Sequence, residues 1–316
     1  GSGTATVAAM GSILIPAMVA QGYDAGFSSA LSAISGSLGT VIPPSITFII
    51  YGMITGESIG DLFLSGIVPG LIFGFMLCIM VFIKSKKNGW KGDTQRASLK
   101  EIGRLFLDTI WGLLSPVIVL GGIYSGLFTP TEAAAVAVVY SLIVGIFIYK
   151  ELRLTELKET LFSTAKTTGM ILLIIMNAGI FSWVLTQQGI AASLTEMALA
   201  LTDNRYIMLF IINIVFLCAG CVMDNTSALY ILVPIIMPIA KALDINMIQL
   251  GVILVLNLSI GQVTPPVGPN LYVAADIGKV KFEEICRRMV PLLLMSLLAL
   301  LCITYIPALS LCLIPS

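Results

Sequence analysis

Two stretches of the chain match each other without a gap at an offset of 222 residues, and each carries a Pro pair inside an apolar segment. A Pro pair removes two backbone donors and cannot continue a helix. In hydrocarbon, such a break is tolerated only where the freed carbonyl groups face protein or a water-filled cavity. Interrupted segments at corresponding places in two halves of a chain are typical of the binding sites of secondary transporters. The matching residues are Thr4 and Thr226, Pro16 and Pro238, Ser37 and Ser259, Gly39 and Gly261, Val41 and Val263, Pro43-Pro44 and Pro265-Pro266, Gly56 and Gly278, and Val68-Pro69 and Val290-Pro291.

The composition is that of a polytopic membrane protein. Hydrophobic residues make up 58% of the chain and charged residues 11%, and the mean hydropathy is +1.02. The formal net charge is zero, which gives no electrostatic basis for binding nucleic acid. The sequence has no histidine and no GxSxG, HExxH or P-loop motif. It therefore predicts an all-α membrane protein that is not an enzyme.

The apolar segments divide into ordinary spans and one exception. Segment 205–242 consists of two short apolar arms that meet at the polar stretch Met223-Asp224-Asn225-Thr226. This arrangement indicates a re-entrant hairpin, and two ordinary short spans are the alternative. The segments long enough to cross about 30 Å of hydrocarbon are 27–54, 61–84, 105–127, 131–149, 160–185, 247–278 and 287–312.

Basic residues predict how the spans are oriented. They gather in three connections, which the positive-inside rule places in the cytoplasm. The connections near 55–60, 128–130 and 186–204 hold no Lys or Arg and are predicted to face outside as loops. All three basic groups lie on the cytoplasmic side only if segment 205–242 returns to the side from which it came. The C-terminus is then predicted to be outside. The basic groups are Lys84, Lys86, Lys87, Lys91, Arg96, Lys100 and Arg104; Lys150, Arg153, Lys158 and Lys166; and Lys279, Lys281, Arg287 and Arg288.

On this map five crossings separate the two broken spans, so the repeats are predicted to have opposite orientations, as in many inverted-repeat transporters. Residues 1–84 form the transport part of the first repeat, and 85–104 form a basic cytoplasmic linker. Residues 105–204 supply the scaffold helices of the second repeat, and 205–316 supply its transport part. The first repeat lacks a counterpart of 105–222, so a comparable apolar stretch is expected upstream. The linker, with Trp90, could instead contact anionic lipid.

The two Pro-Pro elements are candidate cation sites. Unwinding there leaves the carbonyl groups of Gly39 and Ile42, and of Gly261 and Thr264, without helical partners. Such oxygens are hard ligands suited to an alkali cation, and broken helices commonly supply them. Two proline kinks in packed helices are the alternative interpretation.

The hairpin tips are candidate anion sites. Ser2-Gly3-Thr4 corresponds to Asp224-Asn225-Thr226, and each tip starts an apolar helix whose positive end points into the membrane interior. The candidate ligands of a small organic anion are Ser2, Thr4, Asn225 and Thr226 at the tips, and Asn270 after the second break. Asp224 is the charge expected to lie deepest, with a bound cation as its partner. The alternative role of Asp224 is to cap its helix.

These segments resemble the large transmembrane subunit of TRAP (tripartite ATP-independent periplasmic) transporters. The resemblance covers nearly the whole chain. It is strongest in four segments: Gly1-Ser-Gly-Thr-Ala through Ile42-Pro-Pro-Ser-Ile, Tyr51-Gly-Met-Ile-Thr-Gly-Glu-Ser-Ile, Gly126-Leu-Phe-Thr-Pro-Thr-Glu-Ala-Ala-Ala and Thr264-Pro-Pro-Val-Gly.

The resemblance implies an elevator-type transporter, similar to the ion transporter superfamily, in the bacterial inner membrane. It implies uptake of a small organic carboxylate such as a C4-dicarboxylate or a sialic acid, coupled to Na⁺ entry. It also implies a small TRAP membrane subunit and a periplasmic substrate-binding protein as partners. A sodium/dicarboxylate symporter that works without a binding protein is the runner-up. Carried over residue by residue, the sodium ligands are Ser2, Gly39, Ile42 and Pro44 in one half and Asp224, Gly261, Thr264 and Pro266 in the other.

Overall fold

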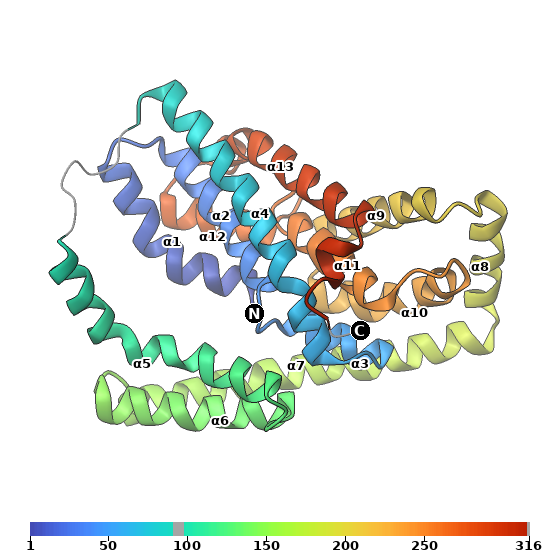
Figure 1. Ribbon diagram of the computed structural model, residues 1–316, viewed down its shortest axis with the longest axis horizontal. Coiled ribbons are helices and arrows are strands. Elements are labelled where there is room, and N and C mark those ends of the chain that lie inside the picture. Colours follow the sequence, from blue (N-terminus) through green and yellow to red (C-terminus); the bar gives the residue numbers. More distant parts are fainter. Residues whose placement is uncertain (91–97, 315–316) are drawn as a thin grey trace. The chain divides into compact units, whose positions relative to one another are not determined.

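The computed structural model describes residues 1–90 and 98–314, and all regular structure within them is helical (Figure 1). The all-α prediction is therefore confirmed. The helices are α1 (Gly3–Ala20), α2 (Ala25–Val41), α3 (Ile46–Thr55), α4 (Ile59–Asn88), α5 (Leu99–Tyr124), α6 (Pro130–Ile143), a π-helical turn (Val144–Ile148), α7 (Leu154–Gln187), α8 (Ile190–Leu201), α9 (Arg205–Val222), α10 (Asn225–Ala242), α11 (Met247–Gly261), α12 (Pro269–Gly278), α13 (Phe282–Tyr305) and α14 (Ala308–Leu311).

Eight of the described helices are long and apolar enough to cross a membrane. The pair α2 and α3 forms a further broken span, with a bend of 40° at the first Pro pair. The linker 85–104 has helical ends, because α4 continues to Asn88 and α5 begins at Leu99. Residues 91–97 of this linker, with Lys91 and Arg96, and the C-terminal residues 315–316 lie outside the described part of the chain.

The sequence repeat is also a repeat of helices. The bounds of α1, shifted by 222 residues, coincide with those of α10, and both helices have 18 residues. The starts of α2 and α11 differ by the same 222 residues, and α3 and α12 have 10 residues each. Even the caps correspond, because Asp24 caps α2 and Asn246 caps α11 through side-chain oxygens. The two halves therefore use the same local signals to start and stop their helices.

The chain divides into two compact units, Gly1–Gly92 with Ala178–Ser316, and Asp93–Asn177. The first unit contains both breaks and has α11 at its centre, where every residue from Gln249 to Gly261 is buried. Helix α2 packs against α1, α11, α12 and α13. The core of this unit is thus made by the two broken helices, one from each repeat.

A chain of buried polar side chains joins three helices of this core. The Asn257 Nδ2 of α11 donates to Asn213 Oδ1 of α9 over 2.6 Å, and Asn213 Nδ2 donates to Thr304 Oγ1 of α13 over 3.1 Å. Gln249 Nε2 of α11 donates to the Thr304 carbonyl oxygen over 3.1 Å. All four residues are at most 3% exposed. Because hydrogen bonds in such a low-dielectric interior are strong, this network fixes α9, α11 and α13 to one another.

Helices α9 and α10 make the arms expected of segment 205–242. Helix α9 follows α8 after a connection of three residues, and α10 packs back against α8 after the turn at Met223 and Asp224. The chain therefore doubles back at this turn (Figure 1), as both a re-entrant hairpin and two short spans would. The prediction of 186–204 as a loop was wrong in one respect, because Ile190–Leu201 forms α8. Its apolar composition, with the single charge Glu196, supports a short helix.

The second unit holds α5, α6 and the first part of α7. Helix α6 begins with a capping box in which Thr129 and Glu132 satisfy each other's backbone donors, and Pro130 occupies the first turn. The Tyr140 hydroxyl donates to the Trp111 carbonyl oxygen over 2.6 Å and so links α6 to α5. These features make a helical hairpin with a well-defined outer turn.

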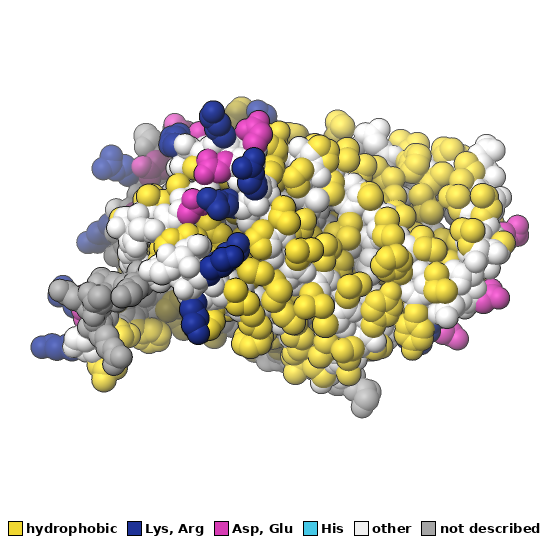
Figure 2. Space-filling model, turned by 90° about the horizontal axis from the view of Figure 1, so that it is seen from above, with side chains coloured by type: hydrophobic (Ala, Val, Ile, Leu, Met, Phe, Trp, Pro, Cys, Tyr) yellow, Lys and Arg dark blue, Asp and Glu magenta, His cyan; other side chains and the backbone are white. Residues whose placement is uncertain are grey.

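In the face shown in Figure 2, the Lys and Arg side chains gather in one area, and most of the visible surface elsewhere is hydrophobic. In the first unit, the end of α4 carries Lys84, Lys86 and Lys87, and the start of α13 carries Arg287 and Arg288. Such a charge distribution suits a protein that presents one basic rim to the cytoplasm.

The topology predicts labelling from opposite sides of the membrane. Single cysteines placed at Asn88, at the end of α4, and at Leu313, after α14, are expected to react with an impermeant thiol reagent from the inside and the outside respectively. The measurement uses intact cells and inverted vesicles, with a cysteine-free variant as the control. Labelling of both positions from the same side would contradict the inverted arrangement.

Candidate functional site

Each broken helix restarts after a short non-helical stretch that its own side chains stabilise. In the first break, the Ser45 hydroxyl donates to the Thr40 carbonyl oxygen over 2.5 Å and accepts from Phe48 N, so it both closes α2 and caps α3. In the second break, the Thr264 hydroxyl donates to the Ile260 carbonyl oxygen over 2.8 Å. The peptide bonds Pro43-Pro44 and Pro265-Pro266 are both cis. The hydrogen bonds of Ser45 and Thr264 give both breaks a defined backbone rather than a simple kink.

The tip of the first repeat lies against the first break. Gly1 is packed so closely that a Cβ there would lie 3.3 Å from the Pro44 carbonyl oxygen and 3.4 Å from Ile46 N. Ser2 is the N-cap of α1 but makes no side-chain capping bond, and its hydroxyl lies 3.3 Å from that of Thr4. The first-turn N–H groups of an 18-residue helix thus remain available at this tip.

The tip of the second repeat lies against the second break. Val267 N donates to the Cys221 carbonyl oxygen over 3.3 Å, which joins the chain after the Pro pair to the end of α9. At Gly220, directly before Cys221, α9 touches α11 through glycine backbones, since a Cβ on Gly261 would lie 2.5 Å from the Cα atom of Gly220. The tips of the two repeats are therefore held by the breaks of their own halves.

The first tip also reaches into the second repeat. A Cβ on Gly3 would lie 2.6 Å from Gln262 Oε1 and 2.8 Å from Asn270 Nδ2. Asn270 Nδ2 in turn donates to Ser37 Oγ of α2 over 3.1 Å. One turn further along α2, the hydroxyl group of Thr40 lies 2.5 Å from that of Ser259 in α11. Polar groups from both repeats thus meet at one place in the core.

Several polar atoms at the tips and breaks lack a partner within the described part of the chain. They are the side-chain carbonyl oxygens of Asn225, Gln262 and Asn270, and each of these residues is at most 8% exposed. An unpaired buried carbonyl oxygen costs about 1–3 kcal/mol. Such groups are retained where a ligand, an ion or water satisfies them in a working state.

The predicted site residues do not all occupy similar environments. Gly261 is buried, Gly39 and Thr264 are partly buried, and Ile42, Pro44 and Pro266 are exposed. Asp224 is exposed and caps α10, where it accepts bonds from Ser227 N and Ser227 Oγ. Ser2, Thr4 and Thr226 are partly buried, whereas Asn225 and Asn270 are buried.

The structure adds Gln262 and Ser37 to the predicted residues. Gln262 directly follows Gly261 in the second break, and Ser37 is the repeat partner of Ser259. Their position in the repeat could have revealed both, but their contacts with Gly3 and Asn270 depend on packing between segments more than 200 residues apart. Asp224 is the only charged residue in 1–6, 36–46, 220–228 and 257–270.

The electrostatics of the site therefore come mainly from helix ends. The N-termini of α1 and α10 each carry a partial positive charge of about half an elementary charge. Carbonyl and hydroxyl oxygens at the breaks supply partial negative charge. Such an arrangement can hold a small anion and a small cation close together without a cluster of ionised side chains.

Comparison with known proteins identifies the family. Residues 1–309 match the tripartite ATP-independent periplasmic transporter family, DctM component. The chain is 43% identical over 313 residues to the C4-dicarboxylate TRAP transporter large permease protein DctM of Pseudomonas aeruginosa, covering 99% of this chain and 73% of that protein. It is 36% identical over 311 residues to the sialic acid TRAP transporter large permease protein SiaM of Vibrio cholerae, covering 98% and 73%.

A third relative has a different length. The chain is 42% identical over 308 residues to the isethionate TRAP transporter permease protein DctMQ of Oleidesulfovibrio alaskensis, covering 98% of this chain but 48% of that protein. The chain thus spans about half the length of this relative and about three quarters of the other two. Since the match to the family extends over nearly all of its residues, the chain belongs to the DctM family of TRAP transporters.

Proposed function

We propose that this chain supplies the transport pathway of a sodium-coupled carrier for a small organic carboxylate. The observation that supports this most strongly is the contact of Gly3, at the first tip, with Gln262 and Asn270 of the second repeat. This contact brings the uncapped N-terminus of α1, amide side chains with unpaired oxygens and both breaks into one region of the first unit. A passive membrane scaffold would not need this concentration of polar groups in its core.

The coupling ion is proposed to be Na⁺ held at the two breaks. Carbonyl oxygens freed from the helices are the natural ligands there, with Gly39 and Ile42 in one half and Gly261 and Thr264 in the other. The carboxylate of Asp224 would add charge at the second tip. Because Na⁺ binding neutralises these partial charges, it would favour the nearby binding of an anion.

The substrate is proposed to bind where the first tip meets the second break. Its carboxylate would accept from the first-turn N–H groups of α1, as anions commonly do at helix N-termini. The unpaired amide oxygens of Asn270, Gln262 and Asn225 can accept hydrogen bonds from hydroxyl groups of the substrate. The names of the relatives assign a C4-dicarboxylate, a sialic acid, 2,3-diketo-L-gulonate and isethionate to those proteins, and all of these are small anions.

The proposed assembly includes a small membrane subunit and a periplasmic substrate-binding protein, as the TRAP relatives imply. An elevator motion is proposed for the first unit, because it contains both breaks and both tips. The second candidate is a symporter of related architecture that works without a binding protein. It is less well supported, because the chain belongs to the DctM family.

The test is uptake into proteoliposomes that contain the complete transporter. We expect accumulation of a radiolabelled carboxylate only with an inward Na⁺ gradient and with the cognate binding protein outside. An equal K⁺ gradient serves as the control. Uptake that is the same with K⁺ would contradict sodium coupling, and uptake without the binding protein would support the second candidate.

A further inference from the structure

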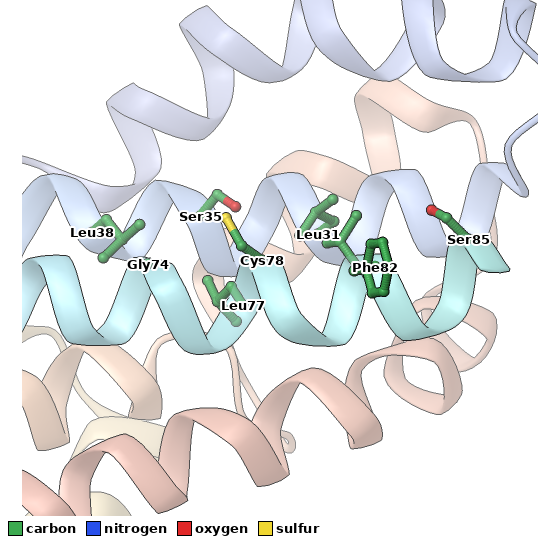
Figure 3. Close-up of a pocket in the computed structure, with 9 residues that line it drawn as sticks. Leu31, Ser35, Leu38, Gly74, Leu77, Cys78, Phe82 and Ser85 are labelled. Carbon is green, nitrogen blue, oxygen red and sulfur yellow. The ribbon is translucent and has the colours of Figure 1, made fainter. Parts of the chain in front are cut away.

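An apolar groove of about 580 Å³ runs between α2 and α4 (Figure 3). Leu31, Ser35 and Leu38 of α2 form one wall, and residues of α4 spaced by three or four positions form the other. This spacing places them on one face of the helix. The α4 residues are Gly74, Leu77, Cys78, Val81, Phe82 and Ser85.

The length and direction of the groove match one leaflet of a bilayer. Gly74 and Ser85 are 11 positions apart on α4, which corresponds to about 16 Å along a helix. That is about half of the ~30 Å hydrocarbon thickness. The Ser85 end is the end that the basic residues predict to face the cytoplasm, so the groove would extend from that surface toward the bilayer centre.

Basic side chains surround the Ser85 end. Lys84 and Lys86 flank Ser85 on either side of the groove-lining face, whereas Lys87 lies nearly opposite to that face on the helix. None of these three lysines makes an ion pair with another residue of the described chain. The Ser85 hydroxyl oxygen is buried and has no partner among the described residues. This end of the groove therefore offers positive charge and an unused hydroxyl group.

The position of these lysines is fixed by packing. Gly89 adopts a left-handed conformation at the end of α4, and Trp90 N donates to the Ser85 carbonyl oxygen over 3.0 Å. The Trp90 ring then packs on Tyr23 and Phe27, with ring centroids 5.0 and 5.1 Å apart. The end of α4 is thus anchored on the start of α2. This contact fixes the position of the basic residues at the Ser85 end of the groove.

We propose that this groove binds an anionic phospholipid of the cytoplasmic leaflet. One acyl chain would lie along Leu31–Leu38 and Gly74–Phe82, and the phosphate would pair with Lys84 and Lys86 and accept from the Ser85 hydroxyl. The apolar walls match the acyl chain, and the positive rim matches the charge that anionic lipids supply at that surface. The site is separate from the proposed transport site, and it does not depend on the identity of the transported substrate.

The test is photocrosslinking in vesicles that contain the complete transporter. The probe is a phosphatidylglycerol with a photoactivatable group on one acyl chain. We expect crosslinked peptides from 31–38 or 74–85, and competition by unlabelled phosphatidylglycerol but not by phosphatidylethanolamine. Soluble glycerol phosphate should not compete, because it lacks the acyl chain that fills the groove.

Variants make the test specific. Lys84→Gln with Lys86→Gln should lower crosslinking by about tenfold or more, since each lysine near an anionic surface contributes about 1 kcal/mol. Lys87→Gln is the matched control and should lower crosslinking much less. Gly74→Phe should fill the groove and block crosslinking; a Cβ there meets only the Leu38 Cδ1 atom, at 3.7 Å, within 4 Å.

Three results would overturn the proposal. The first is crosslinking that maps outside the groove, for example because a partner subunit covers it. The second is equal competition by phosphatidylethanolamine, which would show no selection for negative charge. The third is an equal effect of Lys87→Gln and the double substitution, which would indicate only a general attraction to the membrane surface.

Discussion

Replacing Gly261 with alanine is expected to abolish transport and to destabilise the first unit. The new Cβ would lie 2.5 Å from the Cα and carbonyl carbon atoms of Gly220, and backbone atoms of a packed helix cannot move aside as a side chain can. Overpacking of this kind typically costs about 1–3 kcal/mol or more. Since the same contact holds the second tip against the second break, the ion and substrate sites should be distorted together.

The measurements are thermal unfolding of the purified transporter and sodium-driven uptake in proteoliposomes. Gly179→Ala in α7 is the matched control, because a Cβ there would meet no atom within 4 Å and alanine favours a helix. A Gly261→Ala protein with an unchanged melting temperature and normal uptake would show that α9 and α11 can separate without loss of function.

Asp224→Asn is expected to raise the half-saturating Na⁺ concentration about tenfold, which corresponds to about 1.4 kcal/mol of lost binding free energy. Asparagine retains an oxygen that can cap α10 at Ser227 N, so the helix start should be preserved. What is lost is the negative charge, and a bound cation in a low-dielectric site would feel that loss strongly. Substrate affinity at saturating Na⁺ should change much less.

The comparison is sodium-dependent uptake by the variant and the parent transporter at matched expression. Asp276→Asn provides a control, because Asp276 pairs with Lys279 at an exposed helix end away from the breaks. An unchanged sodium dependence in an active Asp224→Asn transporter would leave Asp224 with its helix-capping role alone. The ion would then have to be held elsewhere.

Local signals predicted most of the fold. The Pro pairs, the capping residues and the apolar run lengths located both breaks, the two arms of segment 205–242 and six of the seven predicted spans. In the seventh, 247–278, α11 is shorter than a membrane span. The prediction of a multi-pass inner-membrane protein is confirmed by the span-length helices and by the family. Helix α8 was missed because a helix of 12 residues is too short to satisfy a criterion based on crossing the bilayer.

The contacts inside the site could not be predicted in the same way. The repeat offset indicates which residues of the two halves correspond, but not which residues are in contact. Gly3 meets Gln262 and Asn270, although its own repeat partner is Asn225. Such a contact depends on how α1 packs across α12, and no local periodicity reports that packing. The roles of the predicted ligands therefore remain predictions, to be tested by the substitutions above.

The series of hydrogen bonds through Asn257, Asn213 and Thr304 limits which helices of the protein can move separately. Sliding α9 past α11 would break at least one buried hydrogen bond between side-chain amides. Helix α9 can therefore bend only outside this network, either near its first turn or near the turn at Met223 and Asp224. The network therefore ties α9, α11 and α13 into one rigid group, and a movement of one of these helices would carry the other two with it.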